Sequence, residues 1–237
     1  RYRVRPYKKE RKMPVNKKTI DTQEIKDNIL MQALADAPFD GWSEDMLVRA
    51  VKTCGYEPEM ARAVFPEDVS DLVAYFSTWA DERMKEKIAK IDPEDLKIRA
   101  RVAKATMARF EVLEPHKEAL RAAAKYWARP FRSIKAKQMI WQTADIIWEW
   151  AGDTATDYNR YTKRGLLVTV IGSTTFYWLT KSDASMEDVD QFLRARIENV
   201  LKVGQAASKL KDVKSFAEAM PIKNFFKSPF SSHNEKV

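Results

Sequence analysis

Hydrophobic residues recur at spacings of three and four along most of the chain, which is the pattern of amphipathic α-helices. Between residues 21 and 36, for example, Ile25, Ile29, Leu30, Ala33 and Leu34 fall on one face of a helix. Proline, glycine and capping residues separate the successive segments. The pattern predicts an all-α fold with helices over residues 21–36, 44–53, 58–64, 66–89, 92–113, 115–128, 134–151 and 185–207.

The stretch 152–180 changes character halfway, because sixteen residues from Gly165 to Thr180 carry no charge. β-Branched and aromatic residues are dense from Leu166 to Trp178, and this composition favours a strand. A single strand has nothing to pair with in a helical chain. We therefore predict a buried helix, with Asp157 in its first turn. The uncharged run is shorter than the roughly 20 apolar residues that span a bilayer.

The formal charge of +8 is located at one end of the chain. Residues 1–18 contain nine Lys or Arg and one Glu, and the other 33 basic and 33 acidic residues cancel. The basic character therefore belongs to an N-terminal arm, residues 1–20. Such an arm suits a solvated tail, a contact for anionic lipid or nucleic acid, or an Arg-rich targeting segment.

Residues that carry catalytic chemistry are sparse. His116 and His233 are the two histidines, and neither stands in a spacing that would place two metal ligands on one helix face. All six glycines are isolated, which excludes a phosphate-cradling loop. Cys54 is the single cysteine and has no neighbouring base. We expect no enzyme, no catalytic residue, no metal site and no cofactor apart from a bound lipid.

Residues 29–76 resemble the amino-terminal helix-turn-helix of TetR-type regulators, with Gly-Trp between the first two helices and a Gly turn before a short third helix. In those regulators the third helix enters the major groove. Here Glu57 and Glu59 would face phosphates, and only Arg62 would compensate them. We expect no nucleic-acid partner, although a TetR-type regulator with a hydrophobic effector stays open as the alternative function.

A second resemblance covers residues 21–209 and rests on FDGWSEDML, WAGDTATDYNRYTKR and SMEDVDQFLRARIENVLKVGQAASK. These stretches resemble the lipid-binding accessory protein family of ubiquinone (coenzyme Q) biosynthesis. The resemblance implies a TetR-like domain of about nine helices plus a C-terminal amphipathic helix. It also implies a bound isoprenoid or phospholipid, which the protein would present to the demethoxyubiquinone hydroxylase.

By the same resemblance, the protein would lie peripherally on the inner membrane, on the mitochondrial matrix side or the bacterial cytoplasmic side. Its assembly stays open between a homodimer and a structural subunit of a larger complex.

The resemblance also implies a partner-docking surface at the end of the seventh helix and the start of the eighth. Asp157, Tyr161 and Arg164 follow i, i+4, i+7 spacing, which displays an acid, an aromatic and a base on one helix face. Arg160 departs from animal members of the family, which carry Trp there. A solvated helix end with local ion pairs is the alternative. The docking residues expected are Ile147, Asp153, Asp157, Arg160, Tyr161 and Arg164.

The resemblance implies that the uncharged half of the same segment walls a lipid cavity, in which its glycines would thin the helix and aromatic residues would line the space. Ordinary core packing is the alternative. The expected lipid-binding residues are Phe110, Ile140, Trp141, Ala144, Trp148, Val168, Gly172, Thr175, Phe176 and Phe192.

Apolar residues alternate with lysines in the C-terminal tail. This composition suits an interfacial segment on an anionic membrane, and a helix packed on its own domain is the alternative. The membrane-contacting residues expected are Leu210, Val213, Phe216, Met220, Phe225 and Phe226. The predicted organisation is a basic arm at 1–20, a helix-turn-helix-like part at 21–89, a lipid-binding part of the same domain at 90–209, and a membrane-binding tail at 210–237.

Overall fold

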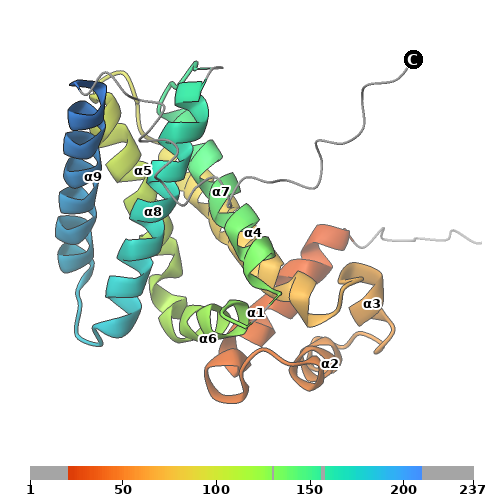
Figure 1. Ribbon diagram of the computed structural model, residues 1–237. Coiled ribbons are helices and arrows are strands. Elements are labelled where there is room, and N and C mark those ends of the chain that lie inside the picture. Colours follow the sequence, from red (N-terminus) through yellow and green to blue (C-terminus); the bar gives the residue numbers. More distant parts are fainter. Residues whose placement is uncertain (1–20, 130, 156–157, 210–237) are drawn as a thin grey trace, which may run out of the picture.

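The computed structural model describes residues 21–129, 131–155 and 158–209, and it contains helices only over these ranges (Figure 1). The all-α prediction is confirmed, and the segment with strand-like composition is helical. The helices are α1 (Thr22–Asp40), α2 (Glu44–Thr53), α3 (Met60–Val64), α4 (Val69–Ile88), α5 (Ile98–Leu113), the 3₁₀ helix η1 (Glu114–His116), α6 (Lys117–Trp127), α7 (Ser133–Trp150), α8 (Tyr158–Thr180) and α9 (Met186–Lys209).

Side-chain caps fix the start of the first two helices. The Asp21 carboxylate accepts a hydrogen bond from the backbone N–H of Gln23 at 3.0 Å, and the Ser43 hydroxyl accepts one from that of Met46 at 3.3 Å. Helix α1 runs past Pro38, beyond its predicted end, and stops at Gly41, where φ is +68°. Glycine adopts this backbone conformation without steric cost.

Two helices begin later than their sequence patterns predict. Helix α4 starts at Val69, because Asp68 has a φ of +54° and the backbone N–H of Val69 donates to Glu44 at 3.2 Å. The acidic stretch from Asp92 forms a turn, in which the Asp92 carboxylate accepts from the N–H of Glu94 at 2.9 Å. Helix α5 begins only at Ile98, after an extended Lys97.

The helices pack around one continuous core. Helix α1 packs on α2, α4 and α6. Helix α4 also packs on α5 and α7, and α8 lies between α7 and α9 (Figure 1). The predicted buried faces of α1 and α4 are confirmed. A buried polar cluster joins α4, α5 and α7, since the Asp81 carboxylate accepts from Arg109 at 2.6 Å and from the Thr143 hydroxyl at 2.9 Å.

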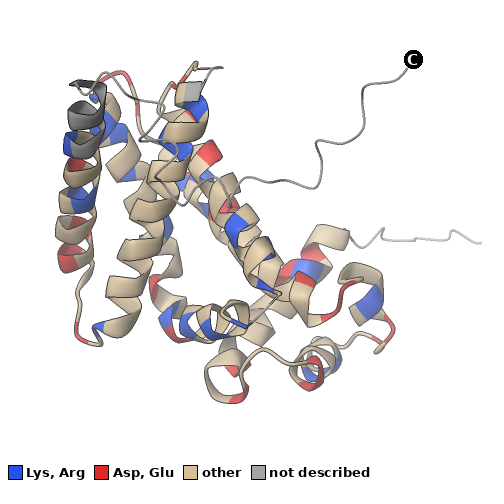
Figure 2. Cartoon of the chain, in the orientation of Figure 1, with Lys and Arg blue, Asp and Glu red and all other residues tan. Residues whose placement is uncertain are grey.

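Charged side chains are spread over most helices, whereas the second half of α8 carries none (Figure 2). Among the described residues, no helix is long and apolar enough to cross a membrane. The basic arm at 1–20 and the tail at 210–237, with its expected membrane residues Leu210, Val213, Phe216, Met220, Phe225 and Phe226, lie outside the described residues.

Candidate functional site

A cluster of acidic and basic side chains lies where α7 turns into α8. Gly152, with a φ of +86°, follows the end of α7, and the backbone N–H of Asp153 donates to the Trp148 carbonyl at 3.0 Å. The indole N–H of Trp148 donates in turn to the Lys163 carbonyl at 3.1 Å. These bonds bring the end of α7 against the first turns of α8. We call the residues Asp145, Asp153, Arg160, Lys163 and Arg164 the charged corner.

Arg164 is the buried centre of the charged corner. Its side chain is 4% exposed, and it donates from Nη1 to Oδ2 of Asp153 at 2.9 Å. The Asp153 side chain is 3% exposed and also accepts from Lys163 Nζ at 2.7 Å. Arg164 pairs through Nε with Asp145 as well. Buried charges persist only when they are paired in this way.

The ion pairs decide the protonation state of Asp153. Burial by itself would raise the pKa of this carboxyl, but hydrogen bonds from Lys163 and Arg164 and the positive charge of Lys163 outweigh it and lower the pKa below its usual value. Asp153 is therefore an ionised structural anchor and is poorly suited to act as a general acid near neutral pH.

Some of the expected docking residues are buried. Ile147 is completely buried, and the side chains of Asp153 and Arg164 lie beneath the surface. Arg164 is therefore not displayed on an exposed helix face, as its spacing from Asp157 and Tyr161 had predicted. Tyr161 is 56% exposed and stacks on Trp141, with 6.4 Å between the ring centroids.

Arg160 is half-exposed and donates to Asp145 at 3.2 Å. Asp157 lies outside the described residues. Tyr161 and Arg160 are therefore the expected docking residues that the described structure leaves accessible.

An apolar cavity of about 420 Å³ lies between α5, α8 and α9. Two of its residues, Ile98 and Leu201, are large apolar side chains that are 53% and 42% exposed. Trp148 and Lys163 also border it, so the cavity adjoins the charged corner. The lining residues are Ile98, Arg99, Val102, Trp148, Lys163, Leu166, Leu167, Val170, Ile197, Val200 and Leu201.

Only Trp148 of the expected lipid-binding residues lines this cavity. Leu166, Leu167 and Val170 lie on one side of α8, and the helical period of 3.6 residues places Val168, Gly172, Thr175 and Phe176 on the other side. These four predicted residues therefore do not line this cavity, and their role in lipid binding stays a prediction. Apolar spacing in α5, α8 and α9, for example Ile197, Val200 and Leu201, is the signal that would have found the cavity.

The remaining expected lipid-binding residues have other environments. Phe110 is buried edge-on against Trp178, with 5.6 Å between the centroids. Phe192 stacks on Tyr177 at 4.2 Å, and Phe176 is 71% exposed. Ile140, Trp141 and Ala144 lie on α7, where Ala144 is fully buried and the other two are half-buried.

The short third helix does not present a cationic surface. Glu57 and Glu59 are exposed before α3, and Arg62 lies 3.9 Å from Asp68. Within the described ranges no group of three or more His, Cys, Asp or Glu could hold a metal ion. Cys54 is half-buried, and burial raises the pKa of its thiol, which disfavours the nucleophilic thiolate.

Residues 134–204 match the COQ9 family model. This match contains the whole charged corner and the α8 and α9 walls of the cavity. The mitochondrial ubiquinone biosynthesis protein COQ9 of Homo sapiens is 26% identical over 205 residues, an alignment that covers 84% of this chain. COQ9 of Drosophila melanogaster is 24% identical over 188 residues, which is 76% of this chain.

This chain is similar to the COQ9 proteins over most of its length. It spans 63% of the length of human COQ9 and 56% of that of the Drosophila protein. Its fold is similar to the crystal structure of a TetR transcriptional regulator from Nitrosomonas europaea, with a TM-score of 0.62 at 18% identity over 75% of this chain and 98% of the regulator. The TetR-like fold is thus confirmed. The segment that matches the COQ9 model contains the charged corner and the part of the cavity that α8 and α9 form.

Proposed function

We propose that this protein is a non-enzymatic lipid-binding protein of ubiquinone biosynthesis. In this proposal the α5–α8–α9 cavity holds an isoprenoid or phospholipid tail at the membrane surface. The charged corner presents the bound molecule to the demethoxyubiquinone hydroxylase. The apolar cavity is the single observation that carries the proposal.

The composition and size of the cavity support an apolar ligand. Nine of the eleven side chains that line it are apolar, and the two exceptions are Arg99 and Lys163. Its volume of about 420 Å³ falls in the range of small-molecule sites, roughly 300–1,000 Å³. Filling the cavity would also cover Ile98 and Leu201, whose exposure to water is unfavourable in the empty protein.

The short distance between cavity and corner supports the presentation step. Lys163 belongs to both, and it lies two residues after the exposed Tyr161 on α8. The first turn of the cavity wall, at Leu166, is therefore only about 7 Å further along the helix axis than Tyr161. Tyr161 itself lies on the opposite side of α8 from the cavity, so a docked partner would reach the end of the cavity through Lys163.

A TetR-type regulator is the competing function. The likeness to the Nitrosomonas regulator concerns the fold, whereas the carboxylates of Glu57 and Glu59 before α3 would repel DNA phosphates. We expect no salt-dependent binding of the protein to duplex DNA at micromolar concentration, measured by fluorescence anisotropy. Binding at that level would favour the regulator.

A titration with the neutral dye N-phenyl-1-naphthylamine tests the proposal. The dye should bind the native chain with a rise in fluorescence. Leu166→Trp should abolish this rise, because the indole fills the cavity from the α8 side. Thr169→Trp is the matched control, since Thr169 is exposed on the same helix and does not line the cavity. Equal dye binding by both variants would remove the cavity as the lipid site.

A further inference from the structure

The turn between α6 and α7 exposes two large apolar side chains. Phe131 is 97% exposed, and Ile134 is 63% exposed. Phe131 also has a φ of +68°, a left-handed conformation that a bulky residue rarely adopts. The fold thus accepts backbone strain at a position that projects an aromatic ring into solvent, and strain of this kind is typical of functional surfaces.

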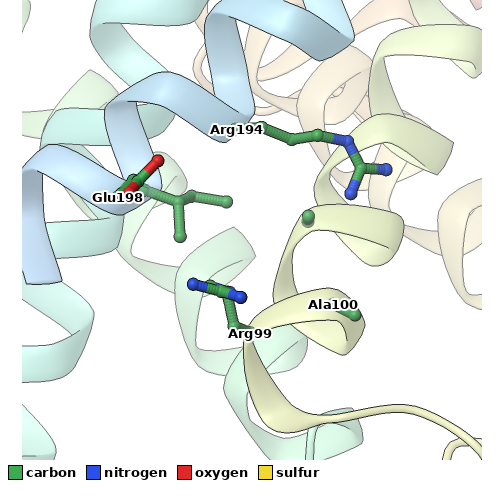
Figure 3. Close-up of a pocket in the computed structure, with 6 residues that line it drawn as sticks. Arg99, Ala100, Arg194 and Glu198 are labelled. Atoms are coloured by element: carbon green, nitrogen blue, oxygen red, sulfur yellow. The ribbon is translucent and has the colours of Figure 1, made fainter.

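Basic residues surround these two side chains in the sequence. The segment 119–144, which contains the turn, carries six Lys or Arg and no Asp or Glu. Figure 2 shows that Lys and Arg prevail along α6. The pocket between α5 and α9 has a contrasting arrangement, because Arg99 and Arg194 lie there together with Glu198 (Figure 3). The α6–α7 turn is therefore a local basic surface.

Three basic side chains of the turn lack a carboxylate partner. Lys125 and Arg129 are exposed and form no ion pair within the described part of the chain. The guanidinium of Arg132 stacks on Tyr126, 3.9 Å from the ring centroid, and its Nη1 has no hydrogen-bond partner among the described residues. Their positive charges are therefore uncompensated, which favours an anionic partner.

Other contacts fix the turn on the domain. Lys135 Nζ lies 2.8 Å from a carboxylate oxygen of Glu67 and 2.9 Å from one of Asp71, at the start of α4. The backbone N–H of Arg132 donates to the carbonyl of Arg129 at 3.3 Å. The start of α7 is thus held on α4, and a hydrogen-bonded turn presents the two exposed apolar side chains.

We propose that this turn is a membrane contact, in which Phe131 and Ile134 enter the headgroup region of a bilayer while the neighbouring cations bind its anionic lipids. Apolar anchors among basic residues are the pattern of an interfacial contact. A second copy of the chain is a poor occupant, because its own basic surface would repel this one. A nucleic acid would satisfy the cations but would leave the aliphatic Ile134 in water.

This inference rests on the membrane location in the proposed function and adds a point of contact on the folded domain. Helix α7 has 18 residues, so its two ends lie about 27 Å apart. The turn is at one end, and the charged corner lies toward the other. A membrane bound at the turn is therefore remote from the accessible docking residues Arg160 and Tyr161.

A dye attached at position 131 of the full chain tests the inference. Cys54→Ser removes the single native thiol, so Phe131→Cys in this background takes acrylodan, whose emission shifts to the blue inside a bilayer. Phosphatidylcholine vesicles with about 30% phosphatidylglycerol should produce this shift, and pure phosphatidylcholine vesicles should not. Phe39→Cys is the matched control, since Phe39 is 88% exposed at the end of α1, outside the basic segment, and should show no shift.

Sedimentation with the same anionic vesicles measures how much each part of the turn contributes. Phe131→Asn with Ile134→Gln should weaken partitioning about tenfold, because both apolar anchors are lost. Asn tolerates the left-handed backbone at position 131, so the circular dichroism spectrum should stay unchanged. Arg129→Gln should weaken partitioning about fivefold. Lys104→Gln is the control, since Lys104 is exposed on α5 outside the basic segment.

The outcomes separate this inference from the membrane location on which it rests. If the native chain does not sediment with the anionic vesicles, the membrane location itself is wrong. If it sediments, but the dye at position 131 does not shift and the turn variants bind like the native chain, the contact lies elsewhere and this inference alone is overturned. A loss for Arg129→Gln without any blue shift would show a cationic surface that stays outside the bilayer, which also overturns it.

Discussion

Arg164 and Asp153 form a buried ion pair, with 2.9 Å between Nη1 and Oδ2 and with 4% and 3% of their side chains exposed. The pair joins the loop after α7 to the second turn of α8. It also gives a structural role to the charged half of the stretch 152–180, which ends where the uncharged half begins at Gly165. The ion pairs of the charged half hold α7 against α8, and among its docking residues that the structure describes Arg160 and Tyr161 remain accessible.

Replacing Arg164 by Met should lower the free energy of unfolding by about 3–5 kcal/mol, because Asp153 and Asp145 would lose a buried partner. Arg160→Met is the matched control. Arg160 also pairs with Asp145, but both side chains are well exposed, so the loss should stay below about 1 kcal/mol. Urea unfolding measures both values, and equal losses would contradict the structural role of Arg164.

The lowered pKa of Asp153 predicts how stability depends on pH. The ionised carboxylate stabilises the fold above the unfolded-state pKa of about 4, and this contribution is lost as the pH falls through the lowered pKa of the native state. The stability difference between the native chain and Asp153→Asn should be constant from pH 5 to 7 and shrink below pH 4. A difference independent of pH down to pH 2.5 would show that the ion pairs contribute nothing.

Two glycines should respond oppositely to substitution by Ala. Gly152 has a φ of +86°, and an added Cβ would lie 3.2 Å from Nη1 of Arg101, so Gly152→Ala should cost about 1–2 kcal/mol. Gly172 lies inside α8 with no atom within 4 Å of an added Cβ, and Gly172→Ala should stabilise by about 0.5–1 kcal/mol. Thermal unfolding of both variants checks the signs. Stabilisation by Gly152→Ala would contradict the turn described here.

Tyr161→Ala should weaken binding of the demethoxyubiquinone hydroxylase by about 2 kcal/mol, because an exposed aromatic on a rigid helix is typical of an interface anchor. The circular dichroism spectrum should stay unchanged. Phe176→Ala is the control, since Phe176 is exposed on the same helix at a distance from the corner. Calorimetric titration with the purified hydroxylase measures the affinity, and unchanged binding by Tyr161→Ala would exclude this surface.

Most helices of the fold were predictable from the sequence. The three-four spacing of apolar residues in α1, α4 and α9 identifies both the helix and the face that packs in the core. The late start of α5 was not predictable, since Asp92 and Pro93 are common both at helix starts and in turns. The strand-like composition of α8 was overruled correctly. The described part of the chain offers α8 no strand to pair with, and this outweighs the propensity of its β-branched residues.

The site was harder to predict than the fold. Sequence spacing identifies which residues share a helix face, but it does not tell which of two apolar faces borders a cavity and which packs in the core. The sequence analysis therefore named Val168 and Gly172, whereas Leu166, Leu167 and Val170 line the cavity that the structure contains. Similarly, i, i+7 spacing grouped Arg164 with Asp157, whereas its burial depends on Asp145 and Asp153 in neighbouring segments.

Mass spectrometry of lipids extracted from the purified chain shows whether the α5–α8–α9 cavity holds a lipid. We expect a lipid with an apolar tail in near-stoichiometric amount, retained by Thr169→Trp and lost from Leu166→Trp, in which the cavity is filled. Lipid retained equally by both variants, or absent from the native chain after purification without detergent, would contradict it.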